Sequence, residues 1–285
     1  MSIKLTDIYY TYSKGTPFER PALKNVSLNI AKGEIVAVIG HTGSGKSTLV
    51  QHLNGLLKPD KGRVLIDDID IMTKDTRVKN AKQQVGMVFQ YPEHQLFAET
   101  VFEDIAFGPR NKGFSEEDTA KQVRDAMKFV GLDYDTFAQR SPFQLSGGQM
   151  RRVAIAGVVA MNPDYLVLDE PSAGLDPRSR NAVFREIMQL HKSRGIAIVL
   201  VTHSMEEAVK YADRLLVINA GTILFDGRPA DIFKEHDEEL ISVGVDVPQV
   251  YKLAALLRRR GLVLPDEIKD EVMLVKAIKK AKGWK

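Results

Sequence analysis

The chain has 285 residues, enough for one large domain or two unequal ones with a sizeable core. Hydrophobic residues make up 44% and charged residues 27%, as in ordinary globular proteins, and no apolar run approaches the roughly 18–20 residues that cross a bilayer. The net charge of +3 is too small to predict nucleic-acid binding. The absence of cysteine excludes disulfides and thiolate metal sites and fits a reducing compartment.

The N-terminal part predicts an antiparallel sheet. Its short alternating segments, such as Ile3–Leu5 and Val26–Ile30, are separated by a polar stretch at residues 13–17 that predicts a loop. Next, the apolar run Ile35–Ile39 predicts a strand buried on both faces. The segment from Ser47 to Leu53 contains no Gly or Pro and predicts a helix.

Residues 40–47, between that strand and that helix, read Gly-His-Thr-Gly-Ser-Gly-Lys-Ser, a complete G-x-x-x-x-G-K-[ST] motif. Its glycines let successive backbone N–H groups face phosphate oxygens, and the positive end of the helix faces the same anion. Lys46 is predicted to reach the β- and γ-phosphates, and the Ser47 hydroxyl to bind Mg²⁺. A Gly-rich turn with a surface lysine is the alternative, which the flanking strand and helix disfavour.

Beyond this loop, buried strands alternate with helices, which predicts a parallel sheet with its ligand at the carboxyl ends of the strands. The expected strands are residues 63–66, 85–89, 165–169 and 196–202, with helices at 177–193 and 205–211 and a hairpin turning at 219–221. Residues 99–145 are helical instead, and another helix follows up to Met161. We therefore expect a helical insertion in the α/β core.

The last 50 or so residues predict two amphipathic helices. The first carries Val250, Leu253 and Leu257 on one stripe, and the second begins at Pro265 with Ile268, Val272 and Val275 on one face. Residues 249–285 hold ten Lys or Arg against four Asp or Glu. This charge indicates either a solvated helix face or contact with an acidic partner or anionic lipid surface.

Two carboxylates follow the predicted strand at residues 165–169. Asp169 at the strand tip can hold Mg²⁺ opposite Ser47, and Glu170 can reach an attacking water and act as a general base. Such a pair by itself is more often a cap for the next segment. The phosphate-binding loop upstream favours the catalytic interpretation.

Residues 145–149 read Leu-Ser-Gly-Gly-Gln and open a predicted helix. The two glycines let backbone amides approach an anion, and Ser146 adds a hydroxyl donor at the positive end of the helix. An N-cap followed by a flexible turn explains the same residues equally well when they are taken alone.

These motifs occur in order with Val-Leu-Asp-Glu-Pro at 167–171, Gly-Leu-Asp-Pro at 174–177 and an isolated His203 after a buried strand. In this combination residues 1–235 resemble an ATP-binding cassette ATPase. The resemblance implies a P-loop NTPase α/β fold with a RecA-like parallel-sheet core, an antiparallel β subdomain and an inserted helical subdomain at about 91–161. Residues 236–285 would be a short C-terminal helical extension. Two cassettes would pair head to tail, with each ATP between the P-loop of one and the signature helix of the other.

The resemblance also implies roles for single residues. Glu170 is the general base, His203 contacts the γ-phosphate, and Lys46 and Gln90 complete the catalytic group. Mg²⁺ is implied at Ser47, Gln90 and Asp169. Ser146, Gly148 and Gln149 serve the ATP of the opposite cassette, where Asp176 of the D-loop also lies. The full set implied to bind ATP and Mg²⁺ is Tyr12, Gly40, His41, Thr42, Gly43, Ser44, Gly45, Lys46, Ser47, Thr48, Gln90, Ser146, Gly148, Gln149, Asp169 and Asp176.

The aromatic residue that stacks on adenine is less clearly defined. Tyr12 matches the family's stacking position best, but the stretch at residues 13–20 is longer than usual. Tyr10 or Phe18 can substitute, and a core role for Tyr12 stays open.

A narrower resemblance surrounds Gln90, where residues 89–97 read FQYPEHQLF and residues 104–109 read DIAFGP. With His41-Thr42 and the RRVAIAG run at 151–157, these segments are similar to the second ATPase paralogue of energy-coupling factor transporters. The resemblance implies a peripheral protein at the cytoplasmic face of the cell membrane that drives uptake of vitamins or trace nutrients. Ser172, where many relatives have Thr, departs from the pattern without an evident consequence.

The same resemblance implies the partners. They are a paralogous ATPase subunit in a heterodimer, or a second copy in a homodimer, a transmembrane coupling subunit and a separate membrane subunit that binds the nutrient; nucleic acid is not among them. The C-terminal extension is implied to support contact between the ATPases. We expect Tyr91–Phe97 to form a groove for a helix of the coupling subunit, with ordinary packing of the helical subdomain as the alternative.

Three rival functions remain open. The first is a cassette protein outside transport, although such proteins usually carry two cassettes or a long coiled-coil insertion. The second is the ATPase of a conventional importer for a metal ion or peptide. The third is a scaffold that binds ATP without turning it over, which the intact Glu170 and His203 disfavour.

Overall fold

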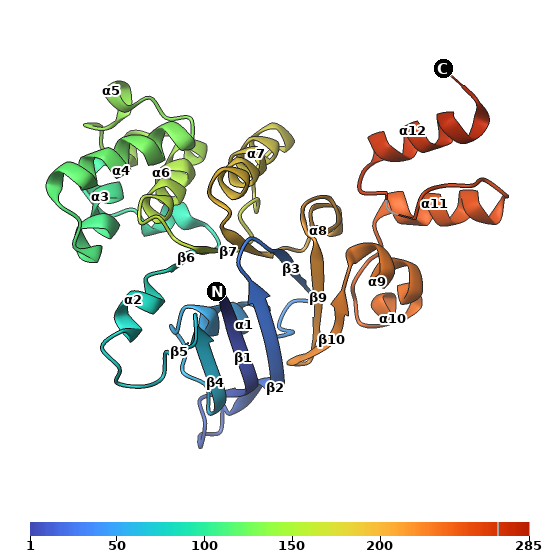
Figure 1. Ribbon diagram of the computed structural model, residues 1–285, viewed down its shortest axis with the longest axis horizontal. Coiled ribbons are helices and arrows are strands. Elements are labelled where there is room, and N and C mark those ends of the chain that lie inside the picture. The colour runs from blue at the N-terminus through green and yellow to red at the C-terminus, as the bar shows by residue number, and fades with distance from the viewer. Residues whose placement is uncertain (267, 285) are drawn as a thin grey trace.

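A computed structural model describes residues 1–266 and 268–284 and has an α/β fold built on two sheets. The central sheet has six strands in the order β10-β9-β3-β8-β7-β6 (Figure 1). Its members are β3 (Ile35–Ile39), β6 (Val85–Val88), β7 (Tyr165–Asp169), β8 (Ala197–Val201), β9 (Arg214–Asn219) and β10 (Thr222–Gly227). All neighbours pair in parallel except the β9–β10 hairpin.

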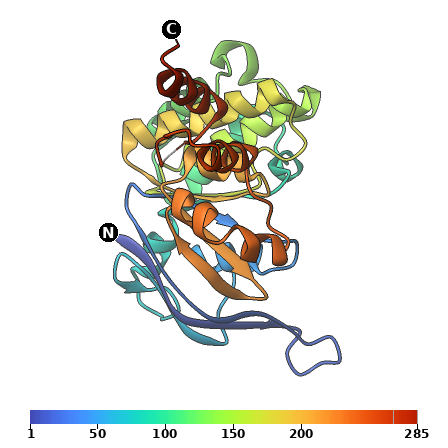
Figure 2. The same cartoon turned by 90° about the vertical axis from the view of Figure 1, so that its right-hand side faces the viewer.

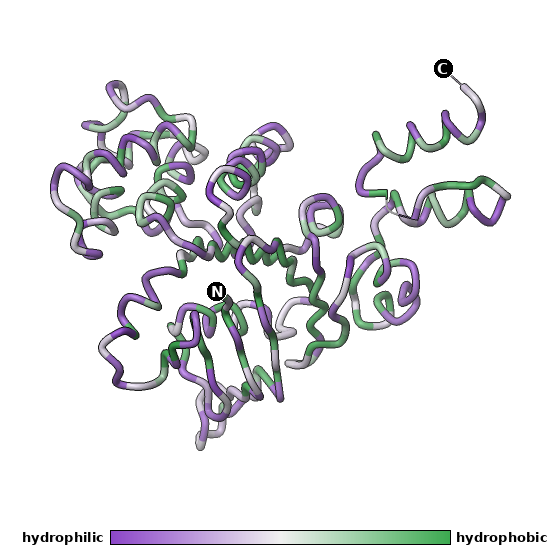
Figure 3. Tube along the Cα trace, in the orientation of Figure 1, coloured by the Kyte–Doolittle hydropathy of each residue, from purple (hydrophilic) through white to green (hydrophobic). Residues whose placement is uncertain are grey.

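Both faces of this sheet are covered, because successive side chains of its strands point to opposite sides. In β3, Val36 and Val38 enter one core cluster, and Ile35, Ala37 and Ile39 enter the other. Every residue of β3, β7 and β8 is buried, and Figure 3 shows these strands as a continuous apolar centre. The predicted parallel-sheet core is therefore confirmed.

One face is covered by the second sheet and by the helix that follows the P-loop. This sheet is antiparallel, has the order β2-β1-β4-β5 and consists of β1 (Ser2–Tyr12), β2 (Arg20–Ala31), β4 (Lys61–Ile66) and β5 (Ile69–Asp70). Helix α1 (Lys46–Leu53) buries Leu49, Val50 and Leu53 in the same cluster. A short helix, α2 (Val78–Lys82), leads from this sheet back to β6.

The other face is covered by α7 (Pro177–Arg194), by α8 (Met205–Tyr211) and by the inserted helices. The insertion contains α3 (Val101–Lys112), α4 (Glu116–Phe129), α5 (Tyr134–Phe137) and α6 (Gly147–Val159), with 3₁₀ turns at Pro92–Gln95 and Pro142–Gln144. Helix α4 begins as expected, because the Ser115 hydroxyl accepts the Asp118 N–H. It ends at Phe129, and Gly131 follows with the left-handed φ of +67° that is typical after a helix end. In Figure 1 the inserted helices α3 to α6 lie at one end of the long axis of the molecule.

The C-terminal part lies at the opposite end and contains α9 (Pro229–Glu235), α10 (Asp237–Ser242), α11 (Gln249–Arg259) and α12 (Glu271–Lys282) (Figures 1 and 2). The prediction of two helices in the last 50 or so residues missed α10, and α9, just before that range, was not predicted either. The predicted boundary at residues 235–236 falls between these two helices.

The predicted start of the last helix at Pro265 was wrong. The carboxylate of Asp270 caps α12 by accepting the Met273 N–H at 2.7 Å, so the helix begins at Glu271. Ile268 lies in the preceding segment and is buried, whereas Val272 and Val275 are exposed.

The predicted stripe of α11 was also incomplete. The core face of this helix consists of Val250, Tyr251 and Ala254, while Leu253 is 45% exposed. Within the described ranges, we find no helix that is both long and apolar enough to cross a bilayer.

Candidate nucleotide-binding and hydrolysis site

The P-loop connects β3 to α1 and has room only for glycine at two positions. Gly40 has φ +151°, and a Cβ there would lie 2.2 Å from the carbonyl oxygen of Ile218 in β9. Gly45 has φ +113°, and its Cβ would lie 2.7 Å from the Ala22 carbonyl oxygen. The loop is therefore pressed against two neighbouring strands, which positions its backbone N–H groups.

Lys46 is held inside the loop. Its Nζ donates hydrogen bonds to the carbonyl oxygens of Gly40 and His41, both at 2.9 Å, and the residue is 5% exposed. Burial lowers the pKa of Lys46, against the opposing charges of Glu170 and Asp169. An anionic phosphate beside this buried cation would offset the cost of desolvating it.

A pocket of about 180 Å³ lies beside the loop. Its walls come from the end of β1, the start of β2 and the P-loop: Tyr12, Arg20, Pro21, Ala22, Gly43, Gly45, Lys46, Ser47 and Thr48. The other predicted loop residues do not line it. The His41 ring contacts the Thr42 carbonyl oxygen, and the fully buried Ser44 hydroxyl has no hydrogen-bond partner within the described ranges.

Tyr12 is the aromatic residue that lines this pocket, and its hydroxyl lies 3.1 Å from Thr48 Oγ1. Tyr10 packs edge-on against Tyr12 and His52, and Phe18 is 83% exposed in the β1–β2 loop. The arrangement favours Tyr12 among the three candidates, and its stacking on adenine stays a prediction.

Sequence reasoning missed Arg20. One guanidinium nitrogen of this residue, Nη2, lies 3.2 Å from the position that a Cβ of Gly43 would take. The side chain thus adds a positive charge to the pocket beside the P-loop. No motif marks Arg20, because the contact depends on the path of the β1–β2 loop.

Glu170 stands at the centre of a hydrogen-bonded cluster. Gln90 Nε2 donates to Glu170 Oε2 at 2.9 Å, and His203 Nε2 lies 2.6 Å from Glu170 Oε1. The three residues follow the carboxyl ends of β6, β7 and β8, which are neighbours in the sheet. Parallel pairing therefore brings together the three predicted residues from distant parts of the chain. A carboxylate and an imidazole so placed can receive a proton from a water molecule.

Asp169 lies one residue before Glu170, at the tip of β7, and is 7% exposed. Burial raises the pKa of its carboxyl group, and a hydrogen bond from the Ser47 side chain partly opposes this shift. Asp169 and Ser47 thus present hard oxygen donors side by side. Within residues 1–266 and 268–284 there is no cluster of three or more His, Cys, Asp or Glu that could hold a metal.

The signature residues, Leu145 to Gln149, are not among the walls of the P-loop pocket. Ser146 caps α6 in a reciprocal capping box with Gln149, and Gly147 and Gly148 have open space where a Cβ would stand. In the described part of the chain, no residue of 145–149 lines the pocket. Asp176 likewise caps α7, accepting the Arg178 and Ser179 N–H groups. The role of these residues in a second cassette's site stays a prediction.

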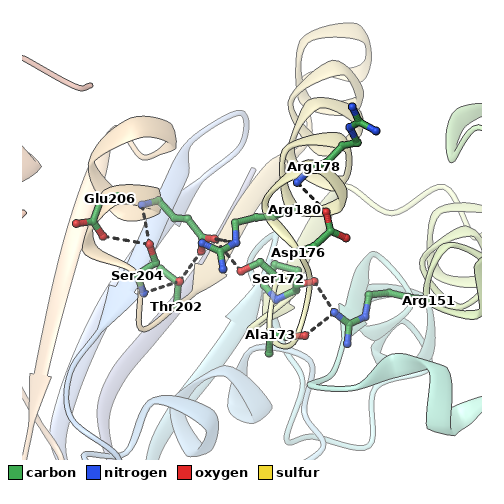
Figure 4. A network of polar contacts seen from close by, with 11 residues as sticks. Arg151, Ser172, Ala173, Asp176, Arg178, Arg180, Thr202, Ser204 and Glu206 are labelled. Carbon is green, nitrogen blue, oxygen red and sulfur yellow. Dashed lines mark hydrogen bonds and ion pairs between the residues drawn. The ribbon is translucent and has the colours of Figure 1, made fainter. Parts of the chain in front are cut away.

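Arg151 is a second residue that sequence reasoning missed. It lies on α6 and is almost completely buried. Its Nε and Nη2 donate to the Glu93 carboxylate at 2.9 and 2.8 Å. Its Nη1 donates to the Ala173 carbonyl oxygen at 2.7 Å (Figure 4). The side chain thus connects the signature helix with the segment after Gln90 and with the segment after Glu170.

Comparison with known proteins identifies the family. Residues 23–173 match the family described as "ABC transporter". The chain belongs to this family. Its relatives include the energy-coupling factor transporter ATP-binding protein EcfA2 of Clostridium tetani, 53% identical over 268 residues, with 94% of this chain and 93% of the relative covered. The EcfA2 of Clostridium perfringens is 52% identical with 94% of both chains covered.

Solved ABC transporter structures agree with the fold. The protein resembles cbiO1 from Clostridium perfringens, described as part of the ABC transporter complex cbiONQ, with 36% identity, a TM-score of 0.73 and 89% and 98% of the two chains covered. It also resembles the dimeric ATP-binding cassette MJ0796 bound to ADP and phosphate, with 32% identity, a TM-score of 0.71 and 80% and 98% covered. The predictions of an ABC ATPase fold, and of an energy-coupling factor ATPase that energises uptake, are thereby confirmed.

Proposed function

We propose that this ATPase works as one of two cassettes in an energy-coupling factor transporter and hydrolyses ATP through Glu170. The observation that supports the chemistry best is the Glu170 carboxylate held between Gln90 and His203, with Lys46 of the P-loop near enough to be acted on by the Glu170 charge. In this arrangement the loop binds the phosphates and the carboxylate receives the proton of the attacking water.

The residues present fit a Mg²⁺ ion. Ser47 and Asp169 supply neighbouring oxygen atoms, and a divalent cation would offset the cost that burial places on the Asp169 charge. Mg²⁺ usually takes few protein ligands and completes its shell with water and phosphate oxygens. We propose that Ser47, Asp169 and Gln90 hold the ion or its water shell. When bound, it would neutralise charge on the phosphates.

In the proposed mechanism each residue has one task. Lys46 stabilises negative charge on the phosphates, and Glu170 takes a proton from water as that water attacks the γ-phosphorus. His203 keeps the Glu170 carboxylate oriented through their 2.6 Å contact and contacts the γ-phosphate. Gln90 donates a hydrogen bond to the other carboxylate oxygen, and its proposed contact with Mg²⁺ would make its position depend on the bound nucleotide.

We propose that a second cassette completes the site. The exposed N-terminus of α6, with Ser146, Gly148 and Gln149, provides hydrogen-bond donors that, within the described part of this chain, do not line the P-loop pocket. In a pair of cassettes, these donors would bind the ATP that is held by the P-loop of a paralogous subunit or of a second copy. ATP binding would then close the pair, and hydrolysis would reopen it.

The transmembrane coupling subunit is proposed to dock near the segment that follows Gln90. Phe97 and Phe107 form an exposed edge-to-face aromatic pair there, with ring centroids 5.0 Å apart. Leu96, expected on the same surface, is 7% exposed and belongs to the core, so a polar residue at this position would disturb folding. The protein would thus lie on the cytoplasmic face of the membrane, and a separate membrane subunit would select the vitamin or trace nutrient.

The C-terminal extension at residues 236–285 is proposed to contact the partner ATPase. It leaves several large apolar side chains exposed, and their burial would favour association. These side chains are Ile241, Leu253, Leu256, Val263, Val272, Met273, Val275 and Trp284.

The variant Glu170→Gln tests the proposed function. The amide is nearly isosteric but cannot accept a proton, so we expect ATP to bind, turnover to fall by about 100-fold or more and a closed pair of cassettes to accumulate. Size measurement with ATP and a phosphate-release assay on the assembled transporter would show both effects. Near-normal turnover would exclude Glu170 as the base, and mass analysis of the same complex would identify the partner ATPase.

A further inference from the structure

A buried carboxylate lies behind the Glu170 cluster and has no role in the mechanism described so far. Glu207, on α8, is 4% exposed. Its Oε1 accepts a hydrogen bond from Ser172 Oγ at 2.7 Å, and its Oε2 accepts one from Thr202 Oγ1 at 2.6 Å. A buried charge without partners would be costly, and here each carboxylate oxygen has a hydroxyl donor.

The two hydroxyl donors, Ser172 and Thr202, lie close in sequence to the proposed base and its histidine. Ser172 lies two residues after Glu170, and Thr202 lies immediately before His203. Figure 4 shows Ser172 and Thr202 turned towards the same point, with Arg180 of α7 reaching towards it. Glu207 therefore connects the two segments that carry the proposed base and its histidine.

The local backbone explains why such a connection is needed. Glu170 has φ +51°, a left-handed conformation that costs free energy in a residue other than glycine and needs support from its surroundings. On one side, its N–H donates to the Val201 carbonyl oxygen at 2.9 Å. On the other, Ser172 Oγ donates to Glu207 at 2.7 Å, and the neighbouring Ala173 carbonyl oxygen accepts from Arg151 Nη1.

We propose that Glu207 is a positioning residue for ATP hydrolysis, which holds Glu170 and His203 in register through Ser172 and Thr202. The role requires a hydroxyl at position 172, which either Ser or Thr provides. The departure from Thr noted in the sequence is therefore without cost. Arg180 Nε lies 3.7 Å from Glu207 Oε1 and balances part of its charge without a hydrogen bond.

Glu207→Ala is the main test, measured on the assembled transporter. Because a small displacement of the base or histidine slows the chemical step more than it weakens nucleotide binding, we expect kcat to fall by about tenfold or more. The KM for ATP should stay within about twofold. Glu206→Ala is the matched control, since Glu206 is the exposed neighbouring carboxylate with one contact of 3.4 Å, to Ser204. Unchanged kcat in folded Glu207→Ala, or an equal loss in the control, would overturn the proposal.

Rescue and coupling separate positioning from a general loss of structure. In Glu207→Gln, the amide oxygen can accept from Ser172 and the amide nitrogen can donate to the Thr202 hydroxyl, so kcat should return to within about threefold of the parent. In a His203→Ala background, Glu207→Ala should cost little further, because both changes act on one unit. Multiplicative losses in the double variant would contradict the proposed connection.

A further variant covers the case in which Glu207→Ala does not fold. Thr202→Val removes one donor at nearly constant volume, so it should lower kcat with little change in KM, whereas Thr202→Ser should behave like the parent. Normal kcat in Thr202→Val would refute the role of this hydrogen bond.

The inference rests on the proposed functions of Glu170 and His203, which the same assay examines separately. If Glu170→Gln and His203→Ala keep normal kcat, the proposed function fails. If both lose activity and Glu207→Ala does not, only the positioning role fails.

Discussion

The buried ion pair between Arg151 and Glu93 permits a prediction whose size follows from the structure. The two side chains are 4% and 15% exposed and share two hydrogen bonds, and Arg151 also donates to the Ala173 carbonyl oxygen. Arg151→Met keeps much of the side-chain volume but leaves the Glu93 carboxylate without its buried partner. Removing one member of such a pair typically costs about 3–5 kcal/mol.

Thermal and urea unfolding of the full chain without nucleotide would measure this loss. At about 2–4 °C per kcal/mol, we expect Tm to fall by roughly 6 °C or more. Arg152→Met is the control, because Arg152 is the next residue of α6 and its hydrogen bonds to the carbonyl oxygens of Gly148 and Gly131 are both long, at 3.4 Å. A loss below about 1 kcal/mol, or one equal to that of the control, would refute the assignment of a buried pair.

The same pair sets a pH dependence. Burial raises the pKa of Glu93, but hydrogen bonds from Arg151, together with its charge, outweigh burial and place the pKa below its usual value. The pair therefore stabilises the fold above the unfolded pKa of about 4.3, and this contribution is lost as pH falls through the lower folded value. The stability difference between the parent and Glu93→Gln should shrink as pH falls from 7 to below about 4. A difference that is constant with pH would contradict this sign.

Three further predictions concern the nucleotide site and the docking surface. Gly40→Ala should destabilise the chain by at least about 2 kcal/mol and abolish ATP binding, because the new Cβ meets the Ile218 carbonyl oxygen; normal Tm and nucleotide affinity would contradict the packing argument. Gly148→Ala meets no atom within 4 Å, so unfolding of the single chain should change by less than about 1 kcal/mol while turnover of the assembled pair falls at least tenfold; unchanged turnover would mean that no partner approaches this position. Phe97→Asp should keep Tm within about 2 °C, since the ring is 61% exposed, and should reduce recovery of the membrane subunit in a pull-down; full recovery would place docking elsewhere.

The sequence alone determined the features that depend on consecutive residues. The strands at 35–39 and 165–169 and the helix at 205–211 have the predicted bounds, because apolar runs and capping residues act over a few positions. The P-loop and the carboxylates at the tip of β7 were visible for the same reason. In each of these motifs the residues that act together are consecutive or a few positions apart, so the sequence shows them directly. The C-terminal helices were harder, because Asp270, rather than Pro265, provides the cap that starts α12.

Only the tertiary structure decided which distant residues meet. Gln90 contacts Glu170 across 80 positions because β6 and β7 are neighbours in the sheet, and the order of strands has no signature in local periodicity. Arg151 reaches Glu93 across 58 positions, and Glu207 reaches Ser172 across 35. A buried polar side chain needs a partner, but its sequence neighbourhood does not name that partner. The packing of helices on the sheet makes that choice, and with it the geometry around the proposed base.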